Sequence, residues 1–321
     1  MKKPRKQLRF GRVLFRAACL TVLIAFTNSC PLRAPGTIHG SIDVDGQRRT
    51  YLLHIPTSEK GSELLPLVVA LHPFTGTGAS MERLTGLSAI ADREGFFVAY
   101  PNGRQRVWNA NPASPSSIFG EPADDVAFIN DLVDRLLADY SIDPDRVYIT
   151  GASSGGLMTH RIAAELTDKL AAAASVMITL PTDFPPLLSP SRPFPFLMMH
   201  GKADPFFPWE GGTVGEGPSR STEYLSIADS LAYWIDNNNA ASQSVKEDLP
   251  DVDPNDGTTV FREEFIANTN GAPVVFYGIR EGGHTWPGSN DIFPESLVGK
   301  TSQDLNASEI IWDFFSDKVC E

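Results

Sequence analysis

Cysteine is scarce in this chain of 321 residues, which contains only Cys19, Cys30 and Cys320. So few cysteines exclude a small fold held together by disulfides, and they also exclude a cysteine-rich metal site. Cys19 lies within an apolar run near the start of the chain. Cys30 and Cys320 could therefore form one disulfide in an oxidising compartment, unless Cys30 is lipidated, in which case Cys320 is a lone thiol.

Basic residues are also in short supply, since 27 Lys and Arg stand against 39 Asp and Glu and give a net charge of −12. Seven of the basic residues fall within the first sixteen positions, where no acid occurs. The remainder of the chain is therefore even more acidic. This charge excludes nucleic acid and an anionic membrane surface as partners.

The N-terminal segment combines these basic residues with an apolar run, Ala17–Phe26, that is too short to span a bilayer comfortably. Such a pattern predicts an export signal over residues 1–30, followed by a single domain over residues 31–321. Cys30 closes the apolar stretch as in a bacterial lipoprotein signal, although Thr27 stands where an aliphatic residue is usual. We expect an extracellular or periplasmic protein that is either plainly secreted or held at a membrane only through a lipid anchor on Cys30.

After this segment, short apolar runs alternate with helical patterns. Two alternating runs, Ile38–Val44 and Tyr51–Ile55, flank Asp45-Gly46, which predicts a leading antiparallel hairpin. Alternation of strand and helix predicts an α/β fold, with a mostly parallel sheet, helices on both faces and the hairpin at one edge. The expected parallel strands are Leu67–Leu71, Phe96–Tyr100, Val147–Thr150, Ala174–Leu180, Phe196–His200 and Val274–Ile279, and the helices are expected around Met81–Ile90, Ile129–Leu137, Leu231–Ile235 and Ile310–Phe315.

The segment Arg146–Gly156 joins an apolar strand to Gly-x-Ser-x-Gly and then to a helical pattern. This arrangement is typical of a nucleophile elbow, in which a sharp turn projects the serine hydroxyl outward. Gly151 and Gly155 leave out side chains that would clash in so tight a bend. The sequence therefore predicts Ser153 as a nucleophile, with an ordinary Gly/Ser turn as the alternative. Ser154 fits only Ala-x-Ser-x-Gly and is expected to offer its backbone N–H instead.

A serine nucleophile needs a histidine to accept its proton and a carboxylate to orient that histidine. His284 follows the last of the parallel-strand runs and completes the order Ser, Asp, His expected for this architecture. For the acid, Asp204 comes four residues after the run that ends at His200, while Asp183 and Glu210 remain alternatives. The histidines set aside lie in the leading strands, in the helix after the serine or before the acid candidates: His39, His54, His72, His160 and His200.

The negative charge of a tetrahedral intermediate calls for two backbone N–H groups. Ser154, directly after the nucleophile, supplies one of them. The other is expected from the loop after Leu67–His72, where Pro73 has no N–H to give. Phe74 is therefore the expected donor, with Thr75 as the alternative.

With these residues assembled, the chain resembles the secreted α/β-hydrolases that include feruloyl esterases, acetylxylan esterases and polyhydroxybutyrate depolymerases, sometimes grouped as LpqC-like esterases. Gly-x-Ser-x-Gly alone is common among hydrolases, whereas an ordered set of motifs is far more specific. The resemblance implies an α/β-hydrolase fold, and it places Ser153, Asp204 and His284 at the triad positions and the residues after His72 in the oxyanion loop. The matching segments occur in the family's order over roughly the whole chain after the export signal: Leu67–His72, Tyr100–Gly103, Trp108-Asn109, Asp124–Val126, Gly151–Gly156, His200–Asp204, Pro208–Gly212 and Gly282–Gly288.

The resemblance also implies a serine carboxylic-ester hydrolase that works through an acyl-enzyme and needs no metal or organic cofactor. The implied substrates are feruloyl or acetyl esters of plant cell-wall polysaccharide, with a polyhydroxybutyrate-type polyester as the alternative. Trp108 matches a position beside the active site, and Trp209 and Trp286 lie in loop segments, so all three are candidates for substrate contact. Two departures from the family pattern are Pro73, where glycine is usual, and Trp209, where tyrosine is common.

Other functions stay open from the sequence. A non-catalytic exported lipoprotein could use the same fold to bind ligands, although no member of the expected triad is missing. A peptidase or thioesterase could use the same triad, because acyl transfer does not fix the leaving group. The acidic segment Asp251–Gly257 is similar to a calcium loop, but Pro254 interrupts it and Arg262 occupies the position of the bidentate glutamate, so we interpret it as a surface turn.

Overall fold

The computed structural model describes residues 35–59, 63–113, 123–215, 221–290 and 293–320. The expected export signal, with Cys19 and Cys30, lies outside the described residues, so the signal, the lipid anchor and the division into signal and domain stay predictions. Cys320 is described, and its Sγ lies 3.0 Å from an Arg192 guanidinium nitrogen and 3.3 Å from the Asp168 carbonyl oxygen. Among the described helices, none is long and apolar enough to cross a membrane.

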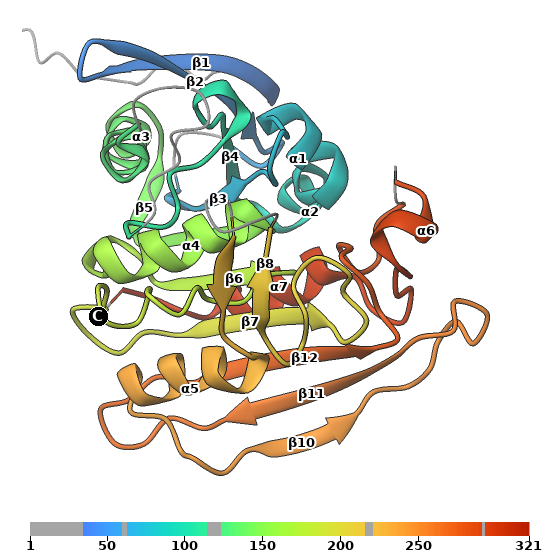
Figure 1. Ribbon diagram of the computed structural model, residues 1–321. Helices are drawn as coiled ribbons and strands as arrows, with labels where there is room; N and C mark the ends of the chain where they lie inside the picture. The colour runs from blue at the N-terminus through green and yellow to red at the C-terminus, as the bar shows by residue number, and fades with distance from the viewer. Residues whose placement is uncertain (1–34, 60–62, 114–122, 216–220, 291–292, 321) are drawn as a thin grey trace, which may run out of the picture. The chain divides into compact units, whose positions relative to one another are not determined.

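In the described residues, ten strands form one sheet in the order β1-β2-β4-β3-β5-β6-β7-β12-β11-β10 (Figure 1). The strands from β4 to β12 in this order run parallel, and antiparallel pairs flank them at both edges. This confirms the predicted α/β-hydrolase fold. The strands are β1 Gly36–Val44, β2 Gln47–Ile55, β3 Leu65–Leu71, β4 Phe97–Pro101, β5 Ile142–Ala152, β6 Ala172–Val176, β7 Phe196–Gly201, β10 Val245–Asp248, β11 Thr259–Phe265 and β12 Val274–Arg280, and β8 Gly212–Val214 pairs with β9 Thr222–Tyr224 in a separate ribbon.

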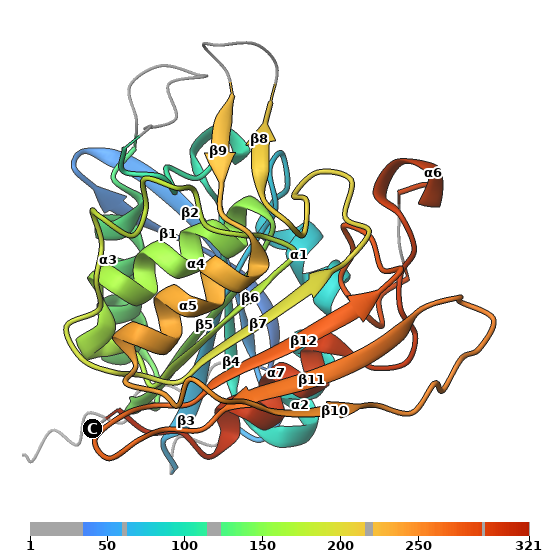
Figure 2. The same cartoon turned by 60° about the horizontal axis from the view of Figure 1, so that its bottom comes forward.

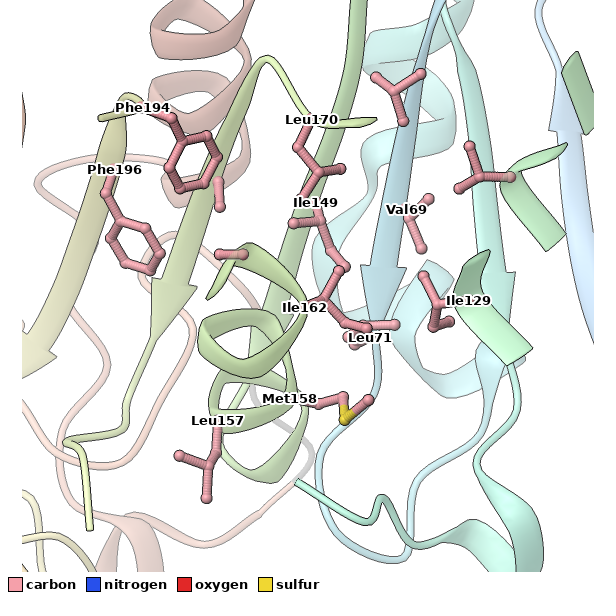
Figure 3. Packing of buried hydrophobic residues seen from close by; sticks show 14 of the residues in the cluster. Val69, Leu71, Ile129, Ile149, Leu157, Met158, Ile162, Leu170, Phe194 and Phe196 are labelled. Carbon is pink, nitrogen blue, oxygen red and sulfur yellow. The ribbon is translucent and has the colours of Figure 1, made fainter. Parts of the chain in front are cut away.

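Helices cover both faces of the sheet (Figure 2). Side chains on both sides of the parallel strands are therefore buried. In β3, Val69 and Leu71 belong to one apolar cluster and Val68 and Ala70 to the other. The first cluster includes α3 Asp125–Asp139, α4 Ser154–Glu165 and α5 Ile227–Asn237, and Figure 3 shows part of its packing around α4. The second cluster includes α1 Gly78–Thr85, α2 Leu87–Glu94 and α7 Ala307–Ser316.

The predicted leading hairpin is confirmed. Val44 pairs with Gln47, so Asp45 and Gly46 form the two-residue turn between β1 and β2. Both turn residues have positive φ, 48° at Asp45 and 73° at Gly46, as the turns that favour Asp-Gly require. β2 then pairs antiparallel with β4, which places the hairpin at one edge of the sheet.

Two expectations about the elements were wrong in detail, and two strands were missed. The helical pattern Met81–Ile90 is two helices, because Gly86 takes a left-handed φ of 62° that ends α1 and begins α2. The strand expected over Ala174–Leu180 ends at Val176, and Met177 follows with a φ of 53° that turns the chain out of the sheet. The antiparallel strands β11 and β10, which extend the sheet beyond β12, were not predicted. The remaining short elements are the 3-10 turns Arg104–Arg106 and Thr167–Lys169 and the helix α6 Glu295–Val298.

His160 is a residue of α4, as expected, and its side chain lies in the core. Its side chain is fully buried, and its ring lies 4.8 Å from that of Phe196 in a stacked arrangement. Nδ1 accepts a hydrogen bond from Trp234 Nε1 at 2.8 Å, so a neutral ring carries its proton on Nε2, which has no partner among the described residues. Burial lowers the pKa of His160 to about 3.

This burial predicts an acid-dependent loss of stability. Unfolded histidine binds a proton near pH 6.5, whereas folded His160 stays neutral down to about pH 3, so the unfolded state binds more protons between these values and the free energy of unfolding falls as the pH falls. Replacing His160 by Gln should remove about 2 kcal/mol of the difference in unfolding free energy between roughly pH 7 and pH 5. Urea unfolding at the two pH values measures this difference.

Trp234→Phe is the matched control, because it removes the indole donor and keeps the titrating ring. It should lower stability at both pH values and preserve the difference between them. An undiminished pH difference in His160→Gln would contradict the prediction.

Candidate active site

Ser153 lies in a strained turn between β5 and α4. Its φ of 53° and ψ of −118° are unusual for a residue with a side chain, and such strain is characteristic of functional turns. The turn is held because the Ser153 N–H donates to the Val176 carbonyl and the Ser153 carbonyl accepts from the Leu157 N–H, both at 2.9 Å. The serine is 7% exposed. The sequence-predicted elbow is therefore present, at the carboxyl end of a central parallel strand.

The two glycines of the elbow are required by close backbone approach. A Cβ on Gly151 would lie 2.3 Å from the Gly155 carbonyl oxygen. A Cβ on Gly155 would lie 2.2 Å from the Leu71 carbonyl oxygen and 2.6 Å from that of His72. Because only glycine permits these contacts, the start of α4 packs directly against the end of β3.

Asp204 and His284 meet at the same edge of the sheet. β7 and β12 are parallel neighbours, and the two residues follow their carboxyl ends. His284 Nδ1 lies 2.7 Å from Asp204 Oδ2. The loop of His284 is fixed by its own N–H, which donates to the Val298 carbonyl at 2.6 Å, and by the Gly283 N–H, which donates to Lys300 at 2.8 Å.

The electrostatics favour an ionised Asp204. Burial acts to raise the pKa of Asp204, but the hydrogen bond and charge of His284 outweigh it and hold the pKa below its usual range. An ionised carboxylate only accepts, so His284 Nδ1 carries a proton, and in the neutral ring Nε2 is left as an acceptor. This is the tautomer that a general base requires.

The alternative acids occupy other positions. Asp183 Oδ1 accepts a hydrogen bond from Asn111 Nδ2 at 3.1 Å. Glu210 lies on the exposed surface. Of the three candidates, Asp204 is the one that the structure joins to His284.

Two further histidines lie near the site but are committed to the backbone. His72 Nδ1 donates to the Pro73 carbonyl at 2.8 Å, and Nε2 accepts from the Gly103 N–H at 3.0 Å. Burial lowers the pKa of His72 to about 4, so the ring is neutral. His200 Nε2 donates to the Phe207 carbonyl at 2.8 Å and lies 3.8 Å from Asp204 Oδ2, and burial lowers its pKa as well.

The hydrogen bonds of the loop after β3 distinguish between the two candidate oxyanion donors, Phe74 and Thr75. The Thr75 N–H donates to the Arg106 carbonyl at 3.0 Å and is therefore occupied. The Phe74 N–H has no hydrogen-bond partner within the described part of the chain. The Pro73 carbonyl accepts from the Gly76 N–H at 2.8 Å, so the turn closes without needing an N–H from the proline.

The segment from Asn102 to Asn109 supports this loop. Trp108 Nε1 donates to the His72 carbonyl at 2.9 Å. The Asn109 N–H donates to Asp125 Oδ2, and the Asn109 carbonyl accepts from Arg161 at 2.6 Å. Asp125 Oδ1 lies 2.5 Å from Arg49 Nη2, and both side chains are buried. This buried ion pair thus holds the segment from Asn102 to Asn109 in place beside the oxyanion loop.

The three tryptophans do not share one environment. Trp108 is 3% exposed and Trp286 is 1% exposed, and Trp286 Nε1 donates to Ser308 Oγ at 3.1 Å. Their burial argues against the predicted substrate contact, because neither ring presents a free face. Trp209 is half-buried and packs against the rings of Phe261 and Phe276.

Aromatic residues that the sequence analysis passed over lie closer to His284. The ring centroid of Phe206 is 5.0 Å from that of His284, and that of Phe207 is 5.6 Å away. Phe206 is 40% exposed. The available signal was Asp204-Pro205, since an aspartate side chain can accept a hydrogen bond from the backbone two residues on and so turn the chain there.

A metal centre is not formed by the described residues, which contain no group of three or more His, Cys, Asp or Glu side chains able to hold an ion. In the acidic segment Asp251–Gly257, the N–H groups of Val252 and Asp253 donate to Asp304 Oδ1. The segment is therefore a turn fastened to a neighbouring carboxylate.

Comparisons with known proteins show the family to which the chain belongs. A family model described as Esterase PHB depolymerase matches residues 49–178, a range that contains Ser153. The protein NocK of Nocardia uniformis subsp. tsuyamanensis, whose name assigns it to the esterases, is 34% identical over 88% of this chain and 84% of its own length. Feruloyl esterase B of Piromyces equi is 26% identical over 63% of this chain, and poly(3-hydroxyalkanoate) depolymerase C of Paucimonas lemoignei is 32% identical over 54%.

This chain spans only 38% and 39% of the lengths of the latter two proteins. Among solved structures, an acetyl xylan esterase from Aspergillus awamori superimposes with a TM-score of 0.53 and 18% identity, covering 77% of this chain and 94% of that one. At this identity the likeness shows the fold. With the family model and the long alignment to NocK, the chain belongs to the Esterase PHB depolymerase family of carboxylic ester hydrolases.

Proposed function

We propose that the protein hydrolyses esters through an acyl-enzyme on Ser153, with His284 as general base and Asp204 as the residue that orients it. The observation that carries this proposal is the 2.7 Å contact between His284 Nδ1 and Asp204 Oδ2, at the sheet edge where Ser153 occupies its strained turn. The order of the three residues along the chain is that of an α/β-hydrolase.

The chemistry follows from these roles. Ser153 Oγ attacks the ester carbonyl carbon while His284 Nε2 takes the hydroxyl proton. The tetrahedral intermediate collapses, the bond to the alcohol oxygen breaks, and the imidazolium gives its proton to that oxygen. Water then attacks the acyl group by the same route and releases the acid. Ionised Asp204 stabilises the imidazolium in both steps.

The oxyanion is proposed to bind the N–H groups of Ser154 and Phe74. Ser154 is the first residue of α4, where backbone N–H groups lack helical partners. In the loop after β3, the Thr75 N–H is bonded to the Arg106 carbonyl, whereas the Phe74 N–H has no partner among the described residues. Since Gly155 allows α4 and β3 to touch, these two donors are held in a fixed relation.

Trp108 is proposed to position this oxyanion loop through its contact with His72, just before the loop begins. Its indole N–H holds the His72 carbonyl, and its ring lies 4.8 Å from the His72 ring. Loss of the indole N–H would leave a buried carbonyl short of a partner and loosen the loop that carries Phe74.

For the substrate, we propose feruloyl or acetyl esters of plant cell-wall polysaccharide. The names of relatives support this choice, since they include feruloyl esterases and acetylxylan esterases. A polyester of hydroxybutyrate type is the second candidate, supported by the depolymerase relatives. An exported location is part of the proposal, on the basis of the basic and apolar N-terminal pattern.

Removing the nucleophile or the base should abolish turnover. Ser153→Ala and His284→Ala are each expected to lower kcat for nitrophenyl acetate by at least about a thousandfold, because the oxyanion donors alone retain little rate. Purified proteins are compared by initial rates, and thermal unfolding verifies that each variant is folded.

Ser154→Ala is the matched control, because it keeps the backbone N–H and removes only a buried hydroxyl that has no partner among the described residues. It should retain activity within about fivefold. A fluorophosphonate probe should label the Ser154→Ala protein and not Ser153→Ala. Failure of the folded wild type to react with the probe would favour a ligand-binding protein without catalysis.

Trp108→Phe tests the supporting role. It should lower kcat by about tenfold and stability by about 1–2 kcal/mol, with KM within about twofold of the wild type, since the oxyanion loop is loosened and no substrate contact is lost. Steady-state kinetics and thermal unfolding measure these quantities. A large increase in KM with unchanged stability would instead show that the ring contacts substrate.

A substrate panel separates the proposed esters. Methyl ferulate or acetylated xylan should be hydrolysed with higher kcat/KM than hydroxybutyrate oligomers or a peptide anilide. Product acids are measured by chromatography. Preferred cleavage of the oligomers would replace the first substrate class by the second.

A further inference from the structure

Asp204 does more than hold His284, because its second oxygen shapes the neighbouring loop. Oδ1 accepts hydrogen bonds from the N–H groups of Phe206 at 2.8 Å and Phe207 at 2.9 Å. The carboxylate that orients the base therefore also fixes the backbone of two aromatic residues. We refer to Phe206 and Phe207 as the aromatic pair.

The two members of the aromatic pair differ in how far their side chains are exposed. Phe207 is half-buried, its ring lies 5.0 Å from that of Tyr224, and its carbonyl accepts from His200 Nε2. Phe206 meets the His284 ring nearly edge-on, at an interplanar angle of 72°, and keeps 40% of its surface exposed. Phe207 is thus part of the packing, whereas Phe206 offers apolar surface beside the catalytic histidine.

The role of His284 in the reaction indicates which half of the ester this surface faces. His284 must approach the alcohol oxygen of the ester, because it protonates that oxygen when the bond to the acyl carbon breaks. The carbonyl oxygen points instead to the donors proposed at Ser154 and Phe74. A ring in contact with His284 therefore lies on the alcohol side of the scissile bond.

From this arrangement we propose that Phe206 forms an alcohol-side subsite that binds ring-shaped or apolar alcohols by stacking and burial. The inference rests on the proposed hydrolysis through Ser153, and it adds which half of the ester the protein selects. The chemical class is an alcohol with a flat apolar face, such as an aryl group or the C–H face of a sugar ring. A small alkyl alcohol would leave Phe206 uncovered.

The test uses acetate esters that share one acyl group and have alcohols of similar reactivity. Phe206→Ala should lower kcat/KM for phenethyl acetate at least about tenfold and for ethyl acetate by less than about threefold. The inhibition constant for free phenethyl alcohol should rise by about the factor by which kcat/KM for phenethyl acetate falls. Phe206→Leu, which keeps apolar bulk and loses the ring, should fall between wild type and Phe206→Ala.

Val319→Ala is the control for loss of an exposed apolar side chain elsewhere. Val319 is 52% exposed, and the adjacent Cys320 N–H donates to Asp145 near the opposite end of β5. This variant should leave both esters unaffected. A second series, ethyl acetate against ethyl hydrocinnamate, varies the acyl group and should show the same selectivity in Phe206→Ala as in wild type.

Equal losses for ethyl and phenethyl acetate would overturn the subsite, because they would show that Phe206 acts only through His284. A change confined to the acyl series would place the ring on the other side of the bond and would also overturn it. Both outcomes are distinct from failure of the proposed function, which would show as activity that survives in Ser153→Ala.

Discussion

The proposed active site depends on one buried carboxylate. Asp204 directs Oδ2 to His284 and Oδ1 to two backbone N–H groups of the loop that follows it. Burial of an ion is costly unless its hydrogen-bonding capacity is met, and here both oxygens are engaged. The position of the imidazole and the path of the loop are therefore set by the same group, so one cannot shift without the other.

The sheet makes this possible by placing β7 beside β12, so that two loops far apart in sequence start from adjacent strand ends. The serine is likewise positioned by contacts between neighbouring elements. The close contact at Gly155 joins α4 to the end of β3, and the neutral His72 and Trp108 tie that end to the segment before Asn109. Ser153 is thus fixed by its backbone hydrogen bond to the end of β6, and His284 by Asp204 and by its backbone hydrogen bond to Val298.

Much of this arrangement could be predicted from the sequence because its signals are local. Apolar runs of strand length, the Asp-Gly turn and Gly-x-Ser-x-Gly each describe a few consecutive residues, and the order Ser, Asp, His added the loops. The antiparallel strands β11 and β10 escaped prediction because their polar residues, such as Arg262 and Glu263, resemble loop composition, and their pairing is set by tertiary contacts.

The environment of single aromatic side chains was also beyond the sequence. Trp108 was expected at the substrate because its position matched a family motif, yet its indole N–H is bonded to the His72 carbonyl in the interior. Phe206 and Phe207 carried no motif, and their place beside His284 follows from the bend that Asp204 imposes. Whether a ring is exposed depends on which distant groups surround it.

The outermost strand β10 has a consequence for how the protein behaves in concentrated solution. Every residue of Val245–Asp248 is exposed, and one side of the strand has no neighbour among the described strands. An open edge of this kind can recruit a strand from another molecule and start an aggregate. The charged side chains of Lys246, Glu247 and Asp248 oppose that growth, because a strand added at this edge would cover charged groups that are now exposed and ion-paired to Glu263, Arg262 and Arg280. The short length of the strand further limits the pairing it could offer.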